Sequence, residues 1–504
     1  MKTRHFLLAL TLGFTAPLLA ADLSDSDSSE PKLETAAFLS CGSIQRDFSR
    51  DITLKNANST SLTILNSDRD TSEDFPSQLA QDALSANAVV ARSAISALRA
   101  FGPPGLEAML KTHANLLKSH TSPGVGIQKN DQDWLRLKSA LDAIARQRDS
   151  YASKLYWFTD LDQAKAAARA TGKPILSLRL LGNLDDELSC ANSRFFRTTL
   201  YSNTQVSDYL RDHFVLHWKS VRPVPKVTID FGDGRKLERT ITGNSIHYVL
   251  DSEGRIIDAL PGLYGAQPFL AGLQQAERLA YQCATSPASE CDQVLHEYHC
   301  ARAAALESDW SRDLAIVRAS SGTVPLPAAL SSGPPSAGAA SRATFSKTQI
   351  ERPILRSVFP DQPTTHAQLE AATDDSTWAS IAALHSDQAR LDESSRALLM
   401  SKAPSALTAG RVTASKIAIE NPVLRQIRNL ERSISEDTVR NEYLFHTKIH
   451  EWLAAAPAAQ NLDAFNSKVY AELFLTPDSD PWLGLVQPEI CTALENNGLV
   501  SNAP

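Results

Sequence analysis

The sequence of 504 residues lacks an excess of positive charge. Its 50 Lys and Arg residues are outnumbered by 57 Asp and Glu residues, which gives a formal net charge of -7. Proteins that bind nucleic acids use basic patches against the phosphates, so this balance argues against a nucleic-acid partner. Hydrophobic residues, at 43%, and charged residues, at 21%, have ordinary frequencies for a folded protein, which argues against disorder throughout.

The sequence also lacks the marks of membrane proteins and of nucleotide-dependent enzymes. No apolar run reaches the roughly 20 residues that a membrane-spanning helix needs. There is no glycine-rich phosphate loop followed by Lys, no dinucleotide fingerprint after a strand and no Gly-x-Ser-x-Gly elbow. We therefore expect no transmembrane segment in the mature protein, no cofactor and none of the common nucleotide or hydrolase functions.

The first 21 residues have the pattern of a secretory signal peptide. Lys2 and Arg4 provide a positive start, residues 6–14 form a short apolar run, and Ala20 and Ala21 offer a small-residue cleavage site. We therefore expect a mature protein that is exported, either to the periplasm or out of the cell.

Cysteines are few, and none belongs to a Cys-x-x-Cys pair. Six follow the signal segment, an even number that is compatible with disulfides in an exported chain. Cys283 closes one predicted helix and Cys291 opens the next, so a disulfide between them would clamp an antiparallel helix hairpin. Cys283 and Cys291 are therefore the disulfide candidates.

Composition and periodicity divide the rest of the chain. Val90, Ala94 and Leu98 recur at helical spacing before the turn at residues 102–105, and residues 83–111 resemble a single HEAT-type repeat. One repeat cannot bury its own apolar face, so it must pack on something else. The predicted divisions are a signal peptide (1–21), a polar, poorly ordered arm (22–74), a helical unit (75–150), a sheet-containing unit (151–283), a helical extension (284–319), a Ser/Pro/Gly/Ala linker (320–349) and a helical C-terminal domain (350–504).

Helix and strand patterns alternate in the sheet-containing unit. A helix over residues 161–171 ends at Gly172, in the C-cap position, and a strand follows over 175–181. The remaining predicted elements are a helix (193–210), a strand (213–221), a hairpin around residue 232, two paired strands (246–250 and 255–260) and a helix (268–283). This order predicts a mixed sheet with helices on both faces.

Three stretches of this unit, residues 162–176, 248–257 and 262–273, are similar to the exported thioredoxin-like domains of bacteria. The resemblance implies an α/β thioredoxin-like domain flanked by mainly α-helical regions. In that family a Cys-x-x-Cys pair begins the helix after the first sheet strand. The resemblance assigns Cys190-Ala-Asn-Ser193 to that position and the substrate groove to Asn244 and Ser245, near which the family has a cis-proline.

Cys190 and Ser193 would then be the catalytic pair, with a serine in place of the second thiol. A thiolate at a helix N-terminus can attack a disulfide, but releasing the mixed disulfide requires a second thiol nearby. The resemblance therefore implies an isomerase-like or trapping activity and not a standard dithiol reductase. The alternatives are that Cys190 is a structural disulfide partner or a buried, inert thiol.

A group of possible metal ligands lies near the C-terminus. Glu442, His446 and His450 recur every four residues and form one stripe on a helix predicted to begin after the capping-type segment Ser433-Ile-Ser-Glu436. Carboxylate and imidazole groups are zinc ligands, so this stripe is a candidate metal site. The alternative is a partly buried, hydrogen-bonded histidine pair.

Four further residues that could bind a metal ion occur together in the helical extension: Cys291, His296, His299 and Cys300. Cys291 and Cys300 are nine residues apart, about half a turn around a helix, so the four side chains cannot converge on one ion. We expect His296 and His299 to be a solvated pair.

Three functions remain open from the sequence. The first is an atypical thiol-disulfide or protein-interaction module that lacks the resolving cysteine, with a protein partner or a disulfide-containing substrate protein. The second is a non-catalytic helical scaffold or adaptor that uses the thioredoxin-like domain only to bind proteins. The third is a metal-binding protein that uses the stripe of Glu442, His446 and His450.

Overall fold

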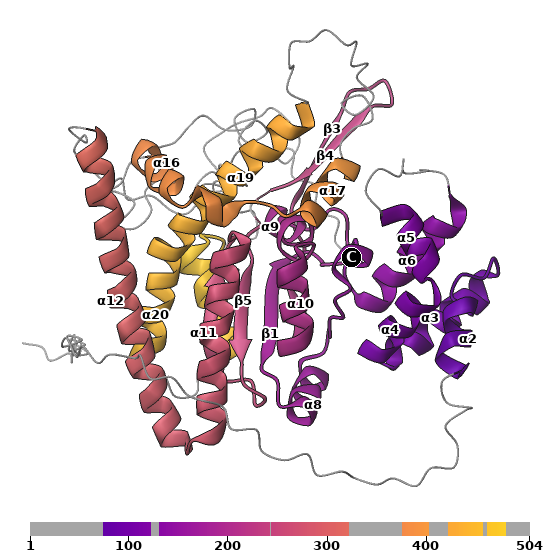
Figure 1. Ribbon diagram of the computed structural model, residues 1–504, viewed down its shortest axis with the longest axis horizontal. Helices are drawn as coiled ribbons and strands as arrows, with labels where there is room; N and C mark the ends of the chain where they lie inside the picture. Colours follow the sequence, from indigo (N-terminus) through magenta and orange to yellow (C-terminus); the bar gives the residue numbers. More distant parts are fainter. Residues whose placement is uncertain are drawn as a thin grey trace, which may run out of the picture. The chain divides into compact units, whose positions relative to one another are not determined.

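Four strands form a mixed sheet in the order β2-β1-β5-β6, and helices lie around it (Figure 1). β1 (Ile175–Leu181) is parallel to β2 (Val215–Arg222) and antiparallel to β5 (Ile246–Leu250), which is antiparallel to β6 (Ile256–Pro261). All residues of β1 and β5 are buried, as expected for central strands covered on both faces. The prediction of a mixed sheet among helices is confirmed.

The computed structural model describes residues 74–121, 131–241, 243–321, 375–402, 422–456 and 461–479, which belong to one compact unit, Ser61–Pro504. The predicted signal peptide and nearly all of the predicted arm and linker lie outside the described residues. Among the described helices, none combines the length and the apolar character needed to cross a membrane.

The helices next to the sheet begin and end at residues that favour those boundaries. Asp160 caps α8 (Leu161–Thr171) by accepting a hydrogen bond from the amide of Gln163, and Gly172 ends it at a positive φ of 72°. The helix predicted over 193–210 is divided instead into α9 (Ala191–Phe195), the π-helical turn η1 (Phe196–Leu200) and α10 (Thr204–His213). The division arises because Asn203 adopts an extended conformation and caps α10.

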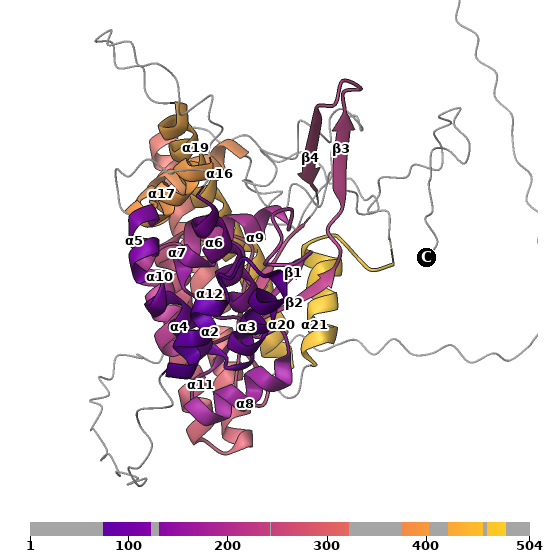
Figure 2. The same cartoon turned by 90° about the vertical axis from the view of Figure 1, so that its right-hand side faces the viewer.

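Two strands lie outside the main sheet. β3 (Lys226–Asp230) and β4 (Lys236–Thr240) pair only with each other among the described strands and project away from the sheet as a hairpin (Figure 2). Ile229 and Phe231 on this hairpin are exposed. The acidic side chains near its tip serve the turn, because Asp230 accepts a hydrogen bond from the amide of Gly232.

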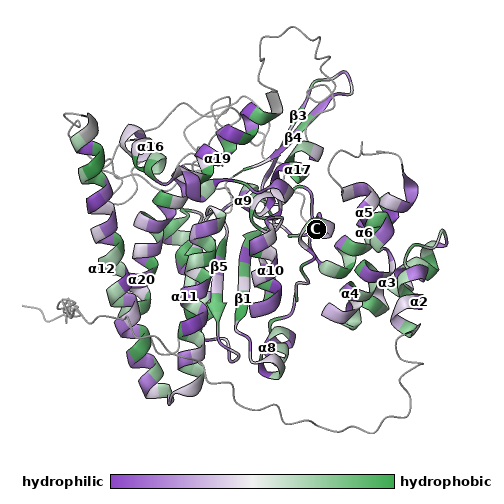
Figure 3. Cartoon of the chain, in the orientation of Figure 1, coloured by the Kyte–Doolittle hydropathy of each residue, from purple (hydrophilic) through white to green (hydrophobic). Residues whose placement is uncertain are grey.

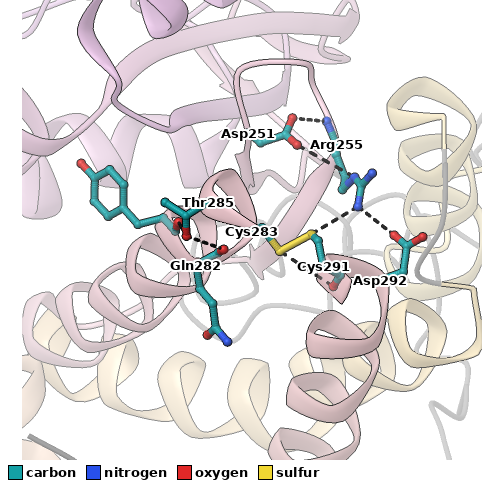
Figure 4. Close-up of a disulfide and its surroundings, with 8 residues drawn as sticks. Asp251, Arg255, Gln282, Cys283, Thr285, Cys291 and Asp292 are labelled. Atoms are coloured by element: carbon teal, nitrogen blue, oxygen red, sulfur yellow. Dashed lines mark hydrogen bonds and ion pairs between the residues drawn. A yellow bond between two sulfur atoms is a disulfide. The ribbon is translucent and has the colours of Figure 1, made fainter. Parts of the chain in front are cut away.

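A disulfide joins two long helices after the sheet. α11 (Ala266–Thr285) and α12 (Ala288–Ser321) form an antiparallel hairpin, and Cys283 and Cys291 are bonded to each other near its turn (Figure 4). This is the pair expected from the sequence. Arg255, after β5, places Nη1 3.2 Å from Cys291 Sγ and 2.7 Å from Asp292 Oδ1, so the hairpin is also tied to the sheet.

The N-terminal helices have an apolar core of their own. They are α2 (Asp74–Asp82), α3 (Ala88–Ala100), α4 (Pro103–Thr112), α5 (Ala114–Thr121), α6 (Gln132–Ala145) and the short α7 (Ser150–Ser153). Leu98, Met109 and Leu141 belong to this core. Gly105 is required where α4 meets α3, since a Cβ at this position would lie 1.9 Å from the carbonyl oxygen of Leu98. Arg99 reaches beyond the core, donating to the carbonyl of Trp157 at 2.6 Å.

The C-terminal helices share the core of the sheet. Their bounds are α16 (Asp375–Leu384), η2 (Ser386–Ala389), α17 (Glu393–Lys402), α19 (Pro422–Arg440), η3 (Asn441–His446), α20 (Thr447–Ala455), α21 (Leu462–Lys468) and η4 (Val469–Leu473). Trp378, Ile449 and Phe465 are buried in one apolar cluster with β1 and β5. Figure 3 shows apolar residues along these two strands and on parts of the surrounding helices. The described helices of the region predicted as a C-terminal domain thus pack into the core of the sheet-containing unit.

One predicted boundary in this region is wrong. Ser433-Ile-Ser-Glu436 does not begin a helix but lies inside α19, which continues through η3 into α20. The serine hydroxyls have other partners: Ser433 donates to the carbonyl of Asn429 in the same helix, and Ser435 donates to the carbonyl of Ala382 in α16. A capping sequence is therefore accommodated in a helix interior when tertiary and local carbonyls satisfy its side chains.

Candidate functional site

Cys190 lies at the N-terminus of α9, after β1, as the sequence predicted. Its Sγ accepts a hydrogen bond from the amide of Ser193 at 3.4 Å and lies 3.1 Å from Ser245 Oγ. The side chain is completely buried. Packing around it is close, because a Cβ on Gly243 would lie 2.2 Å from the Cβ of Cys190.

The residues predicted to complete the thiol site are buried too. Ser193 donates to Ser189 Oγ, at 2.7 Å, and to the carbonyl of Cys190, at 2.9 Å. Asn244 lies beneath η4 of the same chain, whose Tyr470 donates to the Asn244 carbonyl at 2.9 Å. None of the peptide bonds in the described residues is cis. The structure therefore brings Cys190, Ser193 and Ser245 together, but in the interior.

The C-terminal stripe meets a residue of the sheet. Asp258 of β6, His446 at the end of η3 and His450 of α20 each offer a ligand atom, and these atoms lie within 4.8 Å of one another. His446 Nε2 is 3.2 Å and His450 Nδ1 is 3.9 Å from Asp258 Oδ1. All three side chains are buried. Helical spacing stacks the two imidazole rings, whose centroids are 4.1 Å apart.

Glu442 holds His446 from the other side. Its Oε2 lies 3.2 Å from His446 Nδ1, and its Oε1 accepts a hydrogen bond from Arg302 of α12 at 3.2 Å. Glu442 thus contacts the opposite nitrogen of the imidazole from Asp258. Of the predicted stripe, His446 and His450 converge with Asp258, and Glu442 orients His446.

α12 supplies two more members of this cluster. Tyr298 donates to Asp258 Oδ2 at 2.7 Å, and His299 Nδ1 lies 2.8 Å from His450 Nδ1. The expectation that His299 is solvated is wrong: it is buried because α12 packs along α20 (Figure 1). His296 is exposed, as expected, with Nδ1 2.9 Å from the carbonyl of Ala454. Cys291 is held in the disulfide, so the four possible metal ligands of the helical extension do not converge on one ion.

The charges in the cluster follow from burial and from the two carboxylates. Burial alone would lower the pKa of His446, but Glu442 and Asp258 outweigh it and raise the pKa to about 9. Burial would raise the pKa of Asp258, but His450 and His446 hold it well below its usual range. Burial lowers the pKa of His299 to about 4 and that of His450 well below its usual value. At neutral pH, His446 is therefore an imidazolium, while the other two rings are neutral.

A cleft of about 300 Å³ lies on the outer side of Glu442. It is bounded by α11, α12, η2 and the junction of α19 with η3, and its polar lining includes Gln275, Arg302, His385, Glu442 and Tyr443. His385 and Tyr443 both bond to Asp313 Oδ2, at 2.6 Å each. Glu442 therefore connects the cleft to the buried histidine cluster.

Asp258, Tyr298 and Arg302 carry no signal of a site in the sequence, since each is a single polar residue in an element defined by its apolar positions. Comparison of the chain with protein-family models, with curated proteins and with solved structures found no match.

Proposed function

We propose that this chain is an exported thioredoxin-like scaffold or adaptor, whose sheet-containing unit binds proteins and does not exchange disulfides. The observation that carries the proposal is the complete burial of Cys190. Nucleophilic cysteine chemistry requires a thiolate that a substrate disulfide can approach. Here Ser245 contacts the sulfur, and Tyr470 of the chain itself lies over the adjacent Asn244.

The order of elements supports the thioredoxin-like assignment. α8, β1, α9, β2, β5, β6 and α11 follow one another as the resemblance implies, and Cys190 begins the helix after the first strand. On this proposal, the groove that a family member offers to a partner corresponds to Asn244 and Ser245. Tyr470 of η4 donates a hydrogen bond to the Asn244 carbonyl, so a side chain of the same chain would lie where a substrate protein binds.

Export is supported by the disulfide. Cys283 and Cys291 would not stay oxidised in a reducing cytosol, whereas bonds of this kind persist in the periplasm and outside the cell. The leader-like pattern at the N-terminus agrees with that location.

The β3–β4 hairpin is the surface that best suits a protein partner. Two strands alone are marginally stable in water, and a partner that covers the exposed Ile229 and Phe231 would stabilise the hairpin. An extended segment of another protein could add to an edge of this hairpin, where backbone groups are available.

Peptide-level alkylation of the native, mature protein tests the proposal. Iodoacetamide at about pH 8, followed by peptide mapping, reports on each cysteine separately, and the partly exposed Cys300 is the internal control. We expect label on Cys300 and none on Cys190 until a denaturant is added. Labelling of Cys190 as fast as Cys300 would reject the non-catalytic role.

A second experiment addresses partner binding. Cys190→Ala should leave capture of a protein partner unchanged, whereas Phe231→Asp should weaken it without altering the unfolding temperature. If Cys190→Ala lost partner capture as completely as deletion of the protein does, the thiol would be required for function and the non-catalytic role would be rejected.

A further inference from the structure

We infer that Asp258, His446 and His450 bind a divalent transition-metal ion, best matched by zinc, which ties the sheet to the C-terminal helices. Two imidazoles and one carboxylate are a common ligand set for first-row metals, and zinc suits it without redox chemistry. Metal binding here is independent of the role proposed for the sheet-containing unit.

The distances fit a metal ion. Zinc bonds of about 2.0–2.2 Å at tetrahedral angles place neighbouring ligand atoms roughly 3.4 Å apart. Asp258 Oδ1 lies 3.2 Å from His446 Nε2 and 3.9 Å from His450 Nδ1, so the two distances bracket that value. All three ligand atoms lie within 4.8 Å of one another, so they would reach one ion by side-chain rotation.

Two of the three ligand side chains have the hydrogen-bond partners that are typical of a metal site. His446 Nδ1 faces Glu442 Oε2 at 3.2 Å, which leaves Nε2 for the ion and forms a carboxylate–histidine–metal arrangement. The second oxygen of Asp258 accepts the hydrogen bond of Tyr298, which leaves Oδ1 for the ion. Each of these two ligands is thus oriented by a partner on its other polar atom.

His450 offers its Nδ1 to the ion. This atom faces His299 Nδ1 at 2.8 Å, so two imidazole nitrogens from different helices meet beside Asp258. A metal ion would accept the lone pair of His450 Nδ1, and His299 Nδ1, beside it, is the candidate fourth ligand.

Binding requires the ligand atoms to be free of protons. The metal–Nε2 bond takes the place of any Nε2–H bond of His446, and that proton goes to solvent. Occupancy should therefore fall as the pH is lowered. The ligands are closed off from solvent, which is typical of structural metal sites.

Metal analysis of the mature, full-length protein tests the inference. The protein is purified without a histidine tag or chelator, dialysed against zinc and then against buffer, and its zinc content is measured by mass spectrometry. We expect one zinc per chain and a lower unfolding temperature after chelation. A protein that retains no zinc and unfolds at the same temperature with and without chelator overturns the inference.

Variants assign the metal to these residues. Asp258→Asn and His450→Asn should each weaken zinc binding by at least about tenfold, and Glu442→Gln, which leaves the ligands in place, by about 10- to 100-fold. His385→Asn is the matched control, because His385 also pairs with a buried carboxylate, that of Asp313, but lies outside the cluster. It should bind zinc as the native chain does. Unchanged affinity in His450→Asn overturns the assignment.

Cobalt binding to the native chain gives a further readout, which does not require any variant to fold. Co²⁺ bound to the native chain should show visible absorption of a tetrahedral nitrogen and oxygen site. Near-ultraviolet thiolate charge-transfer bands would instead assign the metal to cysteines and contradict the inference.

Discussion

Burial decides the chemistry of Cys190, and burial depends on residues far away in the sequence. The family resemblance placed Cys190 at the start of the helix after the first strand, and Cys190 is the N-cap of α9 in the structure. The sequence could not show that Tyr470 would lie over Asn244, which is 226 positions away. The sequence left open whether the thiol is reactive or inert, and the structure supports the inert alternative.

The histidine cluster, too, could be predicted from the sequence only in its local part. The i, i+4 spacing of His446 and His450 predicted their shared face, since helical geometry is regular. Asp258 is 188 positions from His446 and was not predicted, because no local pattern relates a strand residue to a distant helix. Glu442, the third member of the predicted stripe, instead positions His446.

A buried histidine outside the cluster makes stability depend on pH. His217 of β2 is buried with Nδ1 2.8 Å from Ser177 Oγ, and burial, helped by Arg179, lowers its pKa to about 3. The unfolded chain binds a proton near pH 6.5 and the folded chain does not, so stability is fully present above that pH and is lost as the pH falls toward 3.

The expected loss for His217 is about 2 kcal/mol between pH 8 and pH 5. Urea unfolding of the native chain and of His217→Gln at both pH values measures it. The variant, although less stable at neutral pH, should lose about 2 kcal/mol less on acidification. An equal loss in both proteins would show that His217 is protonated in the folded state.

Among the elements, those with strong local signals were predicted best. α8 ends at Gly172 as expected, and β1 occupies the predicted residues, because a left-handed C-cap and an apolar strand are both encoded locally. The predicted start after Ser433 failed because Ser435 bonds to α16 instead of capping a helix. Caps are ambiguous where serine has a tertiary partner.

The α11–α12 hairpin depends on its disulfide. Cys283 and Cys291 are separated by 8 positions, and closing a loop of this length stabilises a protein by about 2–3 kcal/mol in the chain-entropy description. The double variant Cys283→Ser/Cys291→Ser should therefore unfold with a free energy lower by about that amount.

Reductant provides the control for this prediction. Dithiothreitol should lower the stability of the native chain to that of the double variant and leave the double variant unchanged. Equal stability of the oxidised native chain and the double variant would show that the bond contributes nothing to the hairpin.

At the scale of the whole molecule, the C-terminal helices complete the core of the sheet. Composition predicted the linker near residue 320 and a helical region beyond it, but helical periodicity does not reveal which surface a helix covers. Trp378, Ile449 and Phe465 share one apolar cluster with β1, so the described residues on the two sides of the predicted linker share one core.

Cleavage of the linker tests this shared core. With a protease site inserted at residue 330, cutting the folded protein should leave two fragments that elute together, because separation would expose the buried faces of the sheet and of α16 to η4. Mild urea should separate them. Fragments that part in native buffer would indicate independent domains.

The most direct measurement of the central claim, that Cys190 is closed to disulfide chemistry, is peptide mapping of the native protein after incubation with oxidised glutathione. We predict no glutathione adduct on Cys190 by peptide mapping, and an adduct there once the chain is unfolded. A stoichiometric mixed disulfide at Cys190 in the folded protein would contradict the account.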